Sequence, residues 1–248
     1  MSRFVLILLF LVYGLLVACG TAPARLAEQH TFDASGQTLL KATQAGDIAR
    51  VRALLGAGAA VNTTDPQGNT ALMRAARDGQ DEIVAVLLKH DVQVWMQNRK
   101  GLTALMMASV QGHAAIVRQL VDNGANLNAR TPQGDTALIL ASLFNQADVT
   151  EVLLAHGALV NLREANGITA LMIAADGGHA AIVKLLLERG ANVHAATPGG
   201  ESALVLAKEK GYRTIIDMLK RAGAVEPFGY RPSHEITRND NGAVPAPV

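Results

Sequence analysis

Glycine returns at a constant interval of 33 residues through most of this chain of 248 residues. One series consists of Gly68, Gly101, Gly134, Gly167 and Gly200. A second series keeps the same step and has asparagine at a single place: Gly46, Gly79, Gly112, Asn145, Gly178 and Gly211. Self-similarity at a fixed period of about 20 to 50 residues is typical of proteins built from stacked structural units. The chain is therefore predicted to form an elongated array of repeats.

Each period contains two short helical patterns. The clearest copy, residues 101–133, reads GLTALMMASVQGHAAIVRQLVDNGANLNARTPQ. Thr103 precedes the first pattern, where its hydroxyl group can cap a helix. In the second pattern the apolar residues stand at i, i+1, i+4 and i+5, which gives a helix one buried stripe. Gly112, or Asn145 in the next copy, lies between the two patterns and suits a helix end in the left-handed conformation.

This unit resembles the ankyrin repeat, whose pattern is roughly G-x-T-P-L-H-x-A-A-x-x-G-H-x-x-I-V-x-x-L-L-x-x-G-A-x-V-N. The resemblance covers residues 36–225 in six consecutive copies, of which the terminal two look like caps: the last has polar Lys208 and Lys220 in place of apolar residues, and the first has lost Thr and Gly from its opening turn. It implies an all-α ankyrin-repeat α-solenoid of six stacked helix-turn-helix repeats with β-hairpin finger loops.

The chain departs from the family pattern in its TPLH motif. Alanine replaces the proline in the repeats that keep the motif, and the histidine position is apolar throughout: Met73, Met106, Ile139, Met172 and Val205. We therefore expect the seams between repeats to be held mainly by apolar contact, with methionine as an adaptable filler.

The N-terminus has the organisation of an export signal. Arg3 precedes an apolar run, residues 4–17, that is shorter than the roughly 20 residues of a membrane-spanning helix. The following Leu16-Val17-Ala18-Cys19 resembles the lipobox of bacterial lipoproteins. That resemblance implies a lipoprotein signal peptide at residues 1–18 and lipidation of Cys19, which would anchor the chain to the cell envelope. An ordinary secretory signal with a cysteine near its cleavage site is the alternative.

Two further segments lie outside the repeats. Residues 19–35 have the small residues of a flexible tether, and residues 226–248 form a Pro-rich segment that we expect to be disordered. Gly20 stands where lipoproteins of the inner membrane often carry aspartate. By that resemblance, the expected location is the outer membrane, facing the periplasm.

Charge and motifs favour neither an enzyme nor a nucleic-acid-binding protein. The chain has 22 lysines and arginines against 21 acidic residues, which provides no broad basic face. It lacks the GxxxxGK[ST], HExxH and GxSxG motifs. His113 and His179 stand in the GHAAIV turn of the repeat, where a structural role is expected. We expect no catalysis, cofactor, metal or small-molecule substrate, and a monomer that binds a protein.

The resemblance places exposed, variable positions at the finger tips and at the ends of the first helices. The candidate partner-binding residues among them are Arg77, Arg99, Lys100, Leu102, Val110, Leu143, Phe144, Ile168, Asp176 and Glu201. Their middle members are apolar and their ends are basic and acidic, which predicts an interaction patch with a charge gradient. Leu143 and Phe144 could instead fold back onto neighbouring helices. Trp95, which replaces a finger asparagine, either packs under a distorted finger or serves as a binding anchor.

The function that these features predict is a membrane-anchored scaffold in the bacterial periplasm or cell envelope, which binds a partner protein on its concave ankyrin face. Two alternatives share the same anchor. One is an immunity or inhibitor lipoprotein that acts against an envelope-active toxin or enzyme. The other is a helper protein that supports a periplasmic enzyme in stress defence.

Overall fold

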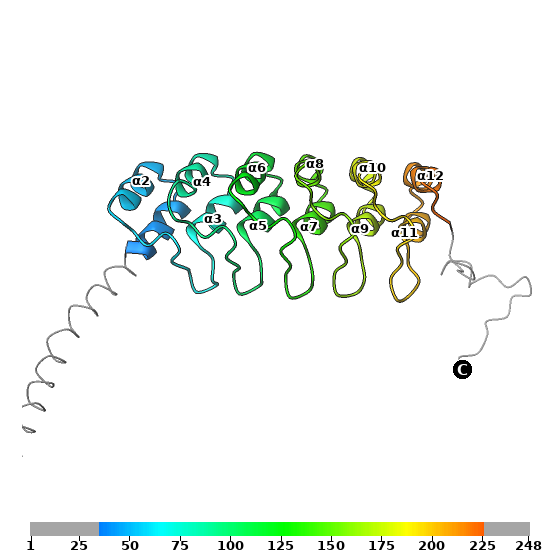
Figure 1. Cartoon of the computed structure of the whole chain (residues 1–248), viewed down its shortest axis with the longest axis horizontal. Helices are drawn as coiled ribbons and strands as arrows, with labels where there is room; N and C mark the ends of the chain where they lie inside the picture. Colours follow the sequence, from blue (N-terminus) through cyan, green and yellow to red (C-terminus); the bar gives the residue numbers. More distant parts are fainter. Residues whose placement is uncertain (1–34, 226–248) are drawn as a thin grey trace, which may run out of the picture.

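The computed structural model describes residues 35–225, which form two rows of short helices with a row of finger loops beneath them (Figure 1). The inner row, next to the fingers, begins with the helical segment 35–44. It continues through α3 (Ala71–Arg77), α5 (Ala104–Gln111), α7 (Ala137–Leu143), α9 (Ala170–Asp176) and α11 (Ala203–Glu209). The outer row consists of α2 (Ile48–Gly56), α4 (Asp81–Leu87), α6 (Ala114–Asp122), α8 (Ala147–Ala155), α10 (Ala180–Glu188) and α12 (Arg213–Arg221).

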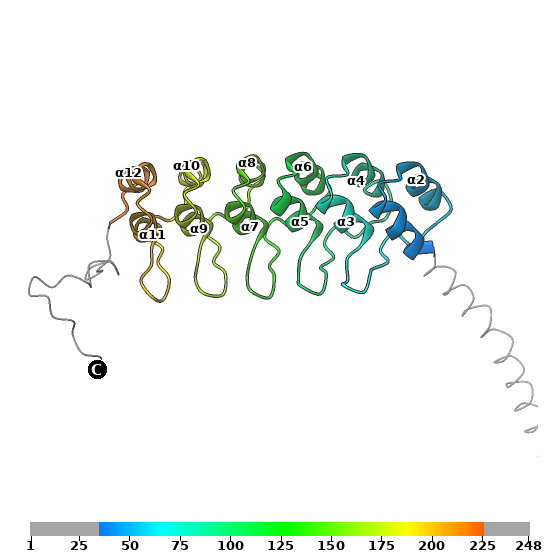
Figure 2. The same cartoon turned by 180° about the vertical axis from the view of Figure 1, so that it is seen from behind.

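Successive repeats stack on one another, as Figure 2 shows from behind. Inner helices contact inner helices, as α5 does α3 and α7, and outer helices contact outer helices. This arrangement confirms the predicted all-α solenoid. The signal peptide, Cys19, most of the tether and the Pro-rich tail lie outside the described residues, so their predictions stay untested.

Small and large apolar residues alternate in the seams. Five inner-row alanines are fully buried, which lets neighbouring helices approach closely: Ala75, Ala108, Ala141, Ala174 and Ala207. The residues that replace the family histidine are buried beside them, so the seams are apolar as predicted: Met73, Met106, Ile139, Met172 and Val205. Full burial of a side chain of this size is worth about 1.5 to 3 kcal/mol.

Each inner helix from α3 to α11 begins with the predicted cap. The side-chain oxygens of Thr70, Thr103 and Thr136 accept hydrogen bonds from the backbone N–H three residues later, at 3.2, 3.2 and 3.3 Å. Thr169 and Ser202 do the same at 3.3 and 3.4 Å. A cap of this kind contributes about 1 kcal/mol to helix stability.

Asn145 also has its predicted conformation. Its φ of 56° makes it the non-glycine residue with positive φ in residues 35–225. The corresponding glycines have φ between 68° and 82°, so the asparagine occupies the same left-handed turn between two helices.

The fingers differ from the β-hairpins that the family resemblance implied. Among residues 35–225 they contain isolated bridges, such as Thr64 with Thr70, instead of paired strands. A side chain at the start of the finger takes up donors that a ladder would need: Asp65 Oδ1 accepts from the backbone N–H groups of Gln67 and Asn69, both at 2.8 Å. Asn98 does the same for Lys100 and Leu102 at 2.9 and 3.0 Å, so each of these fingers is a tight loop.

Candidate protein-binding surface

The inner helices leave one face unburied. We number the residues of each inner helix from its first residue. In α3, α5, α7 and α9, positions one, two, three, five and six are buried, whereas positions four and seven are partly or fully exposed. Residues three apart in a helix lie on the same face, so these two positions form a continuous stripe across the repeats. We call it the inner-helix stripe; its members are Arg74, Arg77, Met107, Val110, Leu140, Leu143, Ile173, Asp176, Leu206 and Glu209.

The inner-helix stripe changes character along the solenoid. Both of its α3 residues are arginines, the residues of α5 and α7 are apolar, and the seventh position becomes acidic in α9 and α11. The sequence-based candidates follow the same order, from basic through apolar to acidic. The fourth position, which includes Met107, Leu140 and Ile173, was missing from the sequence-based candidates. The i, i+3 spacing from the seventh position was the signal that could have found it.

Leu143 and Phe144 are not part of the core, whereas Leu102 and Ile168 pack against it. Leu143 and Phe144, at the end of α7, are 52% and 50% exposed, so they do not fold back fully onto their neighbours. Leu102, Val110 and Ile168 are partly buried. Leu143 and Phe144 therefore form a small solvent-facing apolar cluster at the middle of the molecule, and exposed apolar clusters mark interaction sites.

A pocket of about 210 Å³ opens beside this cluster, between α7, α9, α11 and the adjoining fingers. It brings together four of the predicted site residues: Leu143, Ile168, Asp176 and Glu201. The other lining residues are Met172, Ile173, Gly177, His179, Thr197 and Leu206. The remaining six candidates do not line it: Arg77, Arg99, Lys100, Leu102, Val110 and Phe144.

The charged ends of the surface are partly neutralised. At the basic end, Arg77 binds Asp78 through Nε to Oδ1 at 2.7 Å and through Nη2 to Oδ2 at 3.1 Å, and this hydrogen bonding raises the pKa of Arg77. Arg74 is engaged with Asp65 at 2.9 Å. The predicted positive rim therefore depends mainly on the exposed side chains of Arg99 and Lys100.

At the acidic end, the carboxylate of Asp176 lies 3.6 Å from Nζ of Lys210, with both side chains about half exposed. Glu201 Oε2 accepts a hydrogen bond from the Thr197 hydroxyl at 3.3 Å. Both carboxylates remain in contact with solvent at the pocket rim, where a positively charged group of a partner could reach them.

Trp95 lies outside this surface and is 64% exposed, so it does not pack under its finger. Its counterparts tie adjacent repeats together: Asn62 Oδ1 accepts from the backbone N–H of Gln93 at 2.9 Å, and Asn128 Oδ1 accepts from that of Leu159 at 2.9 Å. An indole cannot accept such a bond. The repeat that contains Trp95 therefore lacks this link to the next one.

His113, in the turn of its repeat, has a structural position. His113 precedes α6, and its Nε2 hydrogen-bonds the carbonyl oxygen of Arg77 in the previous repeat at 3.1 Å. Across residues 35–225, no three histidine, cysteine, aspartate or glutamate side chains gather in a way that could hold a metal ion. None of the helices in the same range is long and apolar enough to span a membrane.

Two rows of stacked helices with a broad exposed stripe define a helical-repeat protein. Three matches to the family model of ankyrin repeats (3 copies) cover residues 11–98, 92–164 and 158–227. The chain therefore belongs to the ankyrin repeat family, which is a non-catalytic fold and a protein–protein interaction module. No curated protein matches the chain.

Proposed function

We propose that this protein is a membrane-anchored scaffold of the bacterial cell envelope and that the inner-helix stripe binds a partner protein. The observation that carries the binding role is the exposed Leu143 near the centre of the stripe, which lines the pocket, together with the exposed Phe144 that follows it directly in the chain. Large apolar side chains exposed together cost free energy in water, and a partner that covers them recovers it. Arg99 and Lys100 at one end and the carboxylates at the other would orient that partner.

The anchoring role is supported by the sequence of the N-terminus. Arg3, the apolar run 4–17 and the Leu16-Val17-Ala18-Cys19 segment together favour export and lipidation of Cys19. Two or three acyl chains give stable membrane attachment, because each buried methylene contributes about 0.8 kcal/mol. The proposed location is the outer membrane, facing the periplasm.

The binding role is tested by cross-linking in envelope extracts of a bacterium that produces the protein. Wild type should capture a discrete partner, and Leu143→Asp with Phe144→Asp should lose it, because two carboxylates on the apolar centre oppose its burial. A matched control is Leu159→Asp with Val225→Asp, since these apolar residues are 55% and 68% exposed and lie outside the stripe. Equal capture by both double variants would contradict the proposal.

The anchoring role is tested separately by Cys19→Ser. The variant should fold as wild type does, judged by circular dichroism, but move from the membrane fraction to the soluble fraction. It should also fail to incorporate radiolabelled palmitate. Membrane fractionation that is unchanged in this variant would contradict lipid anchoring and leave the binding role unaffected.

A further inference from the structure

We infer that the pocket between α7, α9 and α11 receives one large apolar side chain of the protein partner, and that a lysine or arginine flanks this side chain in the partner's sequence. The inference rests on the proposed binding function and specifies the chemistry of the segment that is bound. Its four supporting features are the size of the pocket, its apolar lining, the placement of His179 and the charge of the rim.

The size of the pocket favours a side chain over a metabolite. Pockets for small molecules and cofactors occupy about 300 to 1,000 Å³. This pocket, at about 210 Å³, is smaller and opens directly onto the exposed Leu143. A protein partner that covers the stripe could therefore insert one residue into it. Such inserted residues carry much of the affinity of protein interfaces.

The lining is apolar at its base. Met172 is buried in the seam at the floor, and Ile168, Ile173 and Leu206 are partly buried around it. Their side chains provide dispersion contacts and no hydrogen-bonding groups. An aliphatic or aromatic side chain would therefore be preferred here to a polar one.

The position of His179 results from two departures from the repeat. In other repeats the equivalent side chain lies over the left-handed glycine of the preceding repeat: His113 lies over Gly79, and Tyr212 over Gly178. The residue at that place before His179 is Asn145, which has a Cβ atom.

His179 lies instead over Gly177 of its own repeat, so close that a Cβ atom on Gly177 would clash with the ring. Gly177 has a φ of −79°, so the backbone there does not require glycine, and the absent side chain is what makes room for the ring. The imidazole thereby becomes a wall of the pocket. In the part of the chain that the structure describes, no hydrogen bond holds this ring, which leaves its polar atoms available to a bound segment.

The charge of the rim determines what should flank the anchor. Asp176 and Glu201 line the pocket, and none of its lining residues is a lysine or arginine. Lys210 lies 3.6 Å from the carboxylate of Asp176. The carboxylate of Glu201 accepts a hydrogen bond from Thr197 and has no cationic partner among residues 35–225. Opposite charges across an interface fix the register and exclude wrong partners. A cation adjacent to the anchor would therefore complement the rim.

The test uses a phage library of random dodecapeptides selected on the immobilised full chain. We expect the enriched peptides to contain phenylalanine, leucine or methionine directly beside lysine or arginine. Synthetic copies should bind at least about tenfold more weakly when the apolar residue is replaced by serine, as expected for an anchor. They should also bind about tenfold more weakly to Glu201→Lys, whose lysine repels the cation of the peptide.

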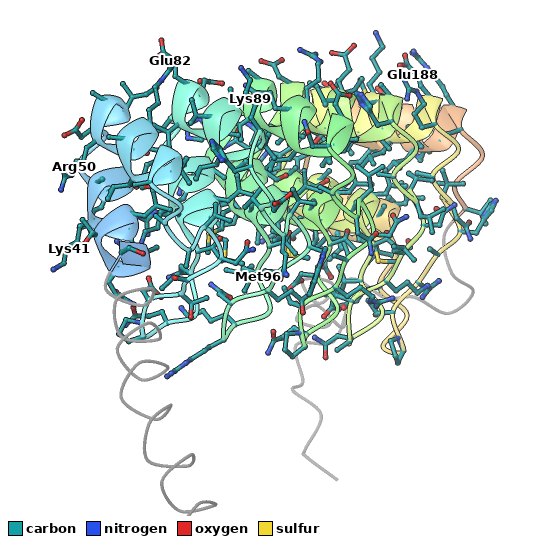
Figure 3. The ribbon with its side chains drawn as sticks, turned by 60° about the vertical axis from the view of Figure 1, so that its left-hand side comes forward. Lys41, Arg50, Glu82, Lys89, Met96 and Glu188 are labelled. Carbon is teal, nitrogen blue, oxygen red and sulfur yellow. The ribbon has the colours of Figure 1, made fainter. Side chains whose placement is uncertain are left out.

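The matched control is Glu188→Lys, at the end of α10. Figure 3 shows Glu188 at the outer row of helices, away from the fingers. This variant makes the same change of charge outside the pocket and should bind the peptides as wild type does. Equal weakening by the two variants would mean that overall charge, and not the pocket rim, determines binding.

The location of the bound peptide is read from methyl NMR spectra of the full chain with ¹³C-labelled methionine. The signal of Met172 should shift on titration, while those of Met73 and Met106, buried at equivalent places in other repeats, should not. Peptides that lack the apolar–cationic pair, or that leave the Met172 signal unchanged, would overturn the inference. So would a failure to select any peptide, as when another segment of this chain or a second copy fills the pocket.

These results are separable from the proposed function. Capture of a partner by wild type but not by Leu143→Asp with Phe144→Asp, combined with failure of the peptide test, would remove the pocket inference alone. Absence of any captured partner would remove the proposed function itself.

Discussion

Replacement of Asn145 tests both the repeat geometry and the origin of the pocket. With φ at 56°, Asn145 occupies the left-handed region, which costs an ordinary L-residue about 1 to 2 kcal/mol and which asparagine tolerates better than most. Asn145→Ala should therefore lower the free energy of unfolding by about 1 kcal/mol. Asn145→Gly should leave it equal or raise it slightly, because glycine has no Cβ atom to strain.

The same pair of variants should affect His179 differently. Gln146 Nε2 donates to the carbonyl oxygen of Val110 at 3.0 Å, and His113 makes the same type of bond, each to a residue 36 positions earlier. For His179 the corresponding carbonyl belongs to Leu143. Asn145→Gly should make room for the His179 ring over residue 145, where it could reach this carbonyl and leave the pocket. Asn145→Ala retains a Cβ atom and should not.

The stabilities are measured by urea unfolding followed by circular dichroism. The ring is followed by ¹⁵N NMR of labelled histidine, in which a new hydrogen bond shifts the ring nitrogen signals. Gln111→Ala, at the end of α5, is a control for an exposed residue before a left-handed turn and should change stability by less than about 0.5 kcal/mol. An alanine variant of Asn145 as stable as the glycine variant would refute the strain argument.

Three further predictions concern the fold. Burial alone would raise the pKa of Asp65, but hydrogen bonds from Asn69, Arg74 and Gln67 outweigh it and hold the pKa below its ordinary value of 3.8. The ionised Asp65 carboxylate therefore contributes its full stabilisation of the folded state above about pH 3.8 and loses it as pH falls through the folded pKa. The difference in the free energy of unfolding between wild type and Asp65→Asn, measured by urea unfolding, should shrink below that pH. Leu138→Ala should cost about 2 to 5 kcal/mol, whereas Leu143→Ala, on the same helix but half exposed, should cost less than about 1.5 kcal/mol; equal losses would place Leu143 in the core. Thr136→Ala removes a cap and should cost about 1 kcal/mol in the same assay, while Thr136→Ser should retain most of it.

The sequence predicted the repeating part of the fold well because each buried position occurs several times. The caps formed by Thr103 and its counterparts, the buried Met106 position and the left-handed turn at Asn145 were all evident from periodicity and residue type. The fingers were predicted less well. Whether a loop forms a ladder or a single bridge depends on local hydrogen bonds such as those of Asp65, which compete with strand pairing.

The lining of the pocket was predicted in part for a similar reason. Leu143, Ile168, Asp176 and Glu201 could be placed near one another from their positions in the repeat, and the structure brings them to one pocket. The position of the His179 ring could not be predicted, because it depends on whether Asn145 and Gly177 leave room for a ring. Ion pairs such as that of Arg77 with Asp78 also could not be predicted, because they depend on side-chain conformations that the repeat pattern does not determine.

Comparison among the repeats separates the requirements of the fold from those of binding. The third position of the inner helices is buried and apolar in every copy from α3 to α11, because each seam needs a filled core there. The fourth position has the same backbone geometry but holds Arg74 in one copy and Met107 or Ile173 in others. Met107, Ile173 and Leu206 pack against the core from this position, so stacking favours an apolar residue there and tolerates Arg74 as the exception. Under the proposed function, the partner that covers the inner-helix stripe is a second physical constraint on those residues, and a complementary partner would match their order from basic through apolar to acidic.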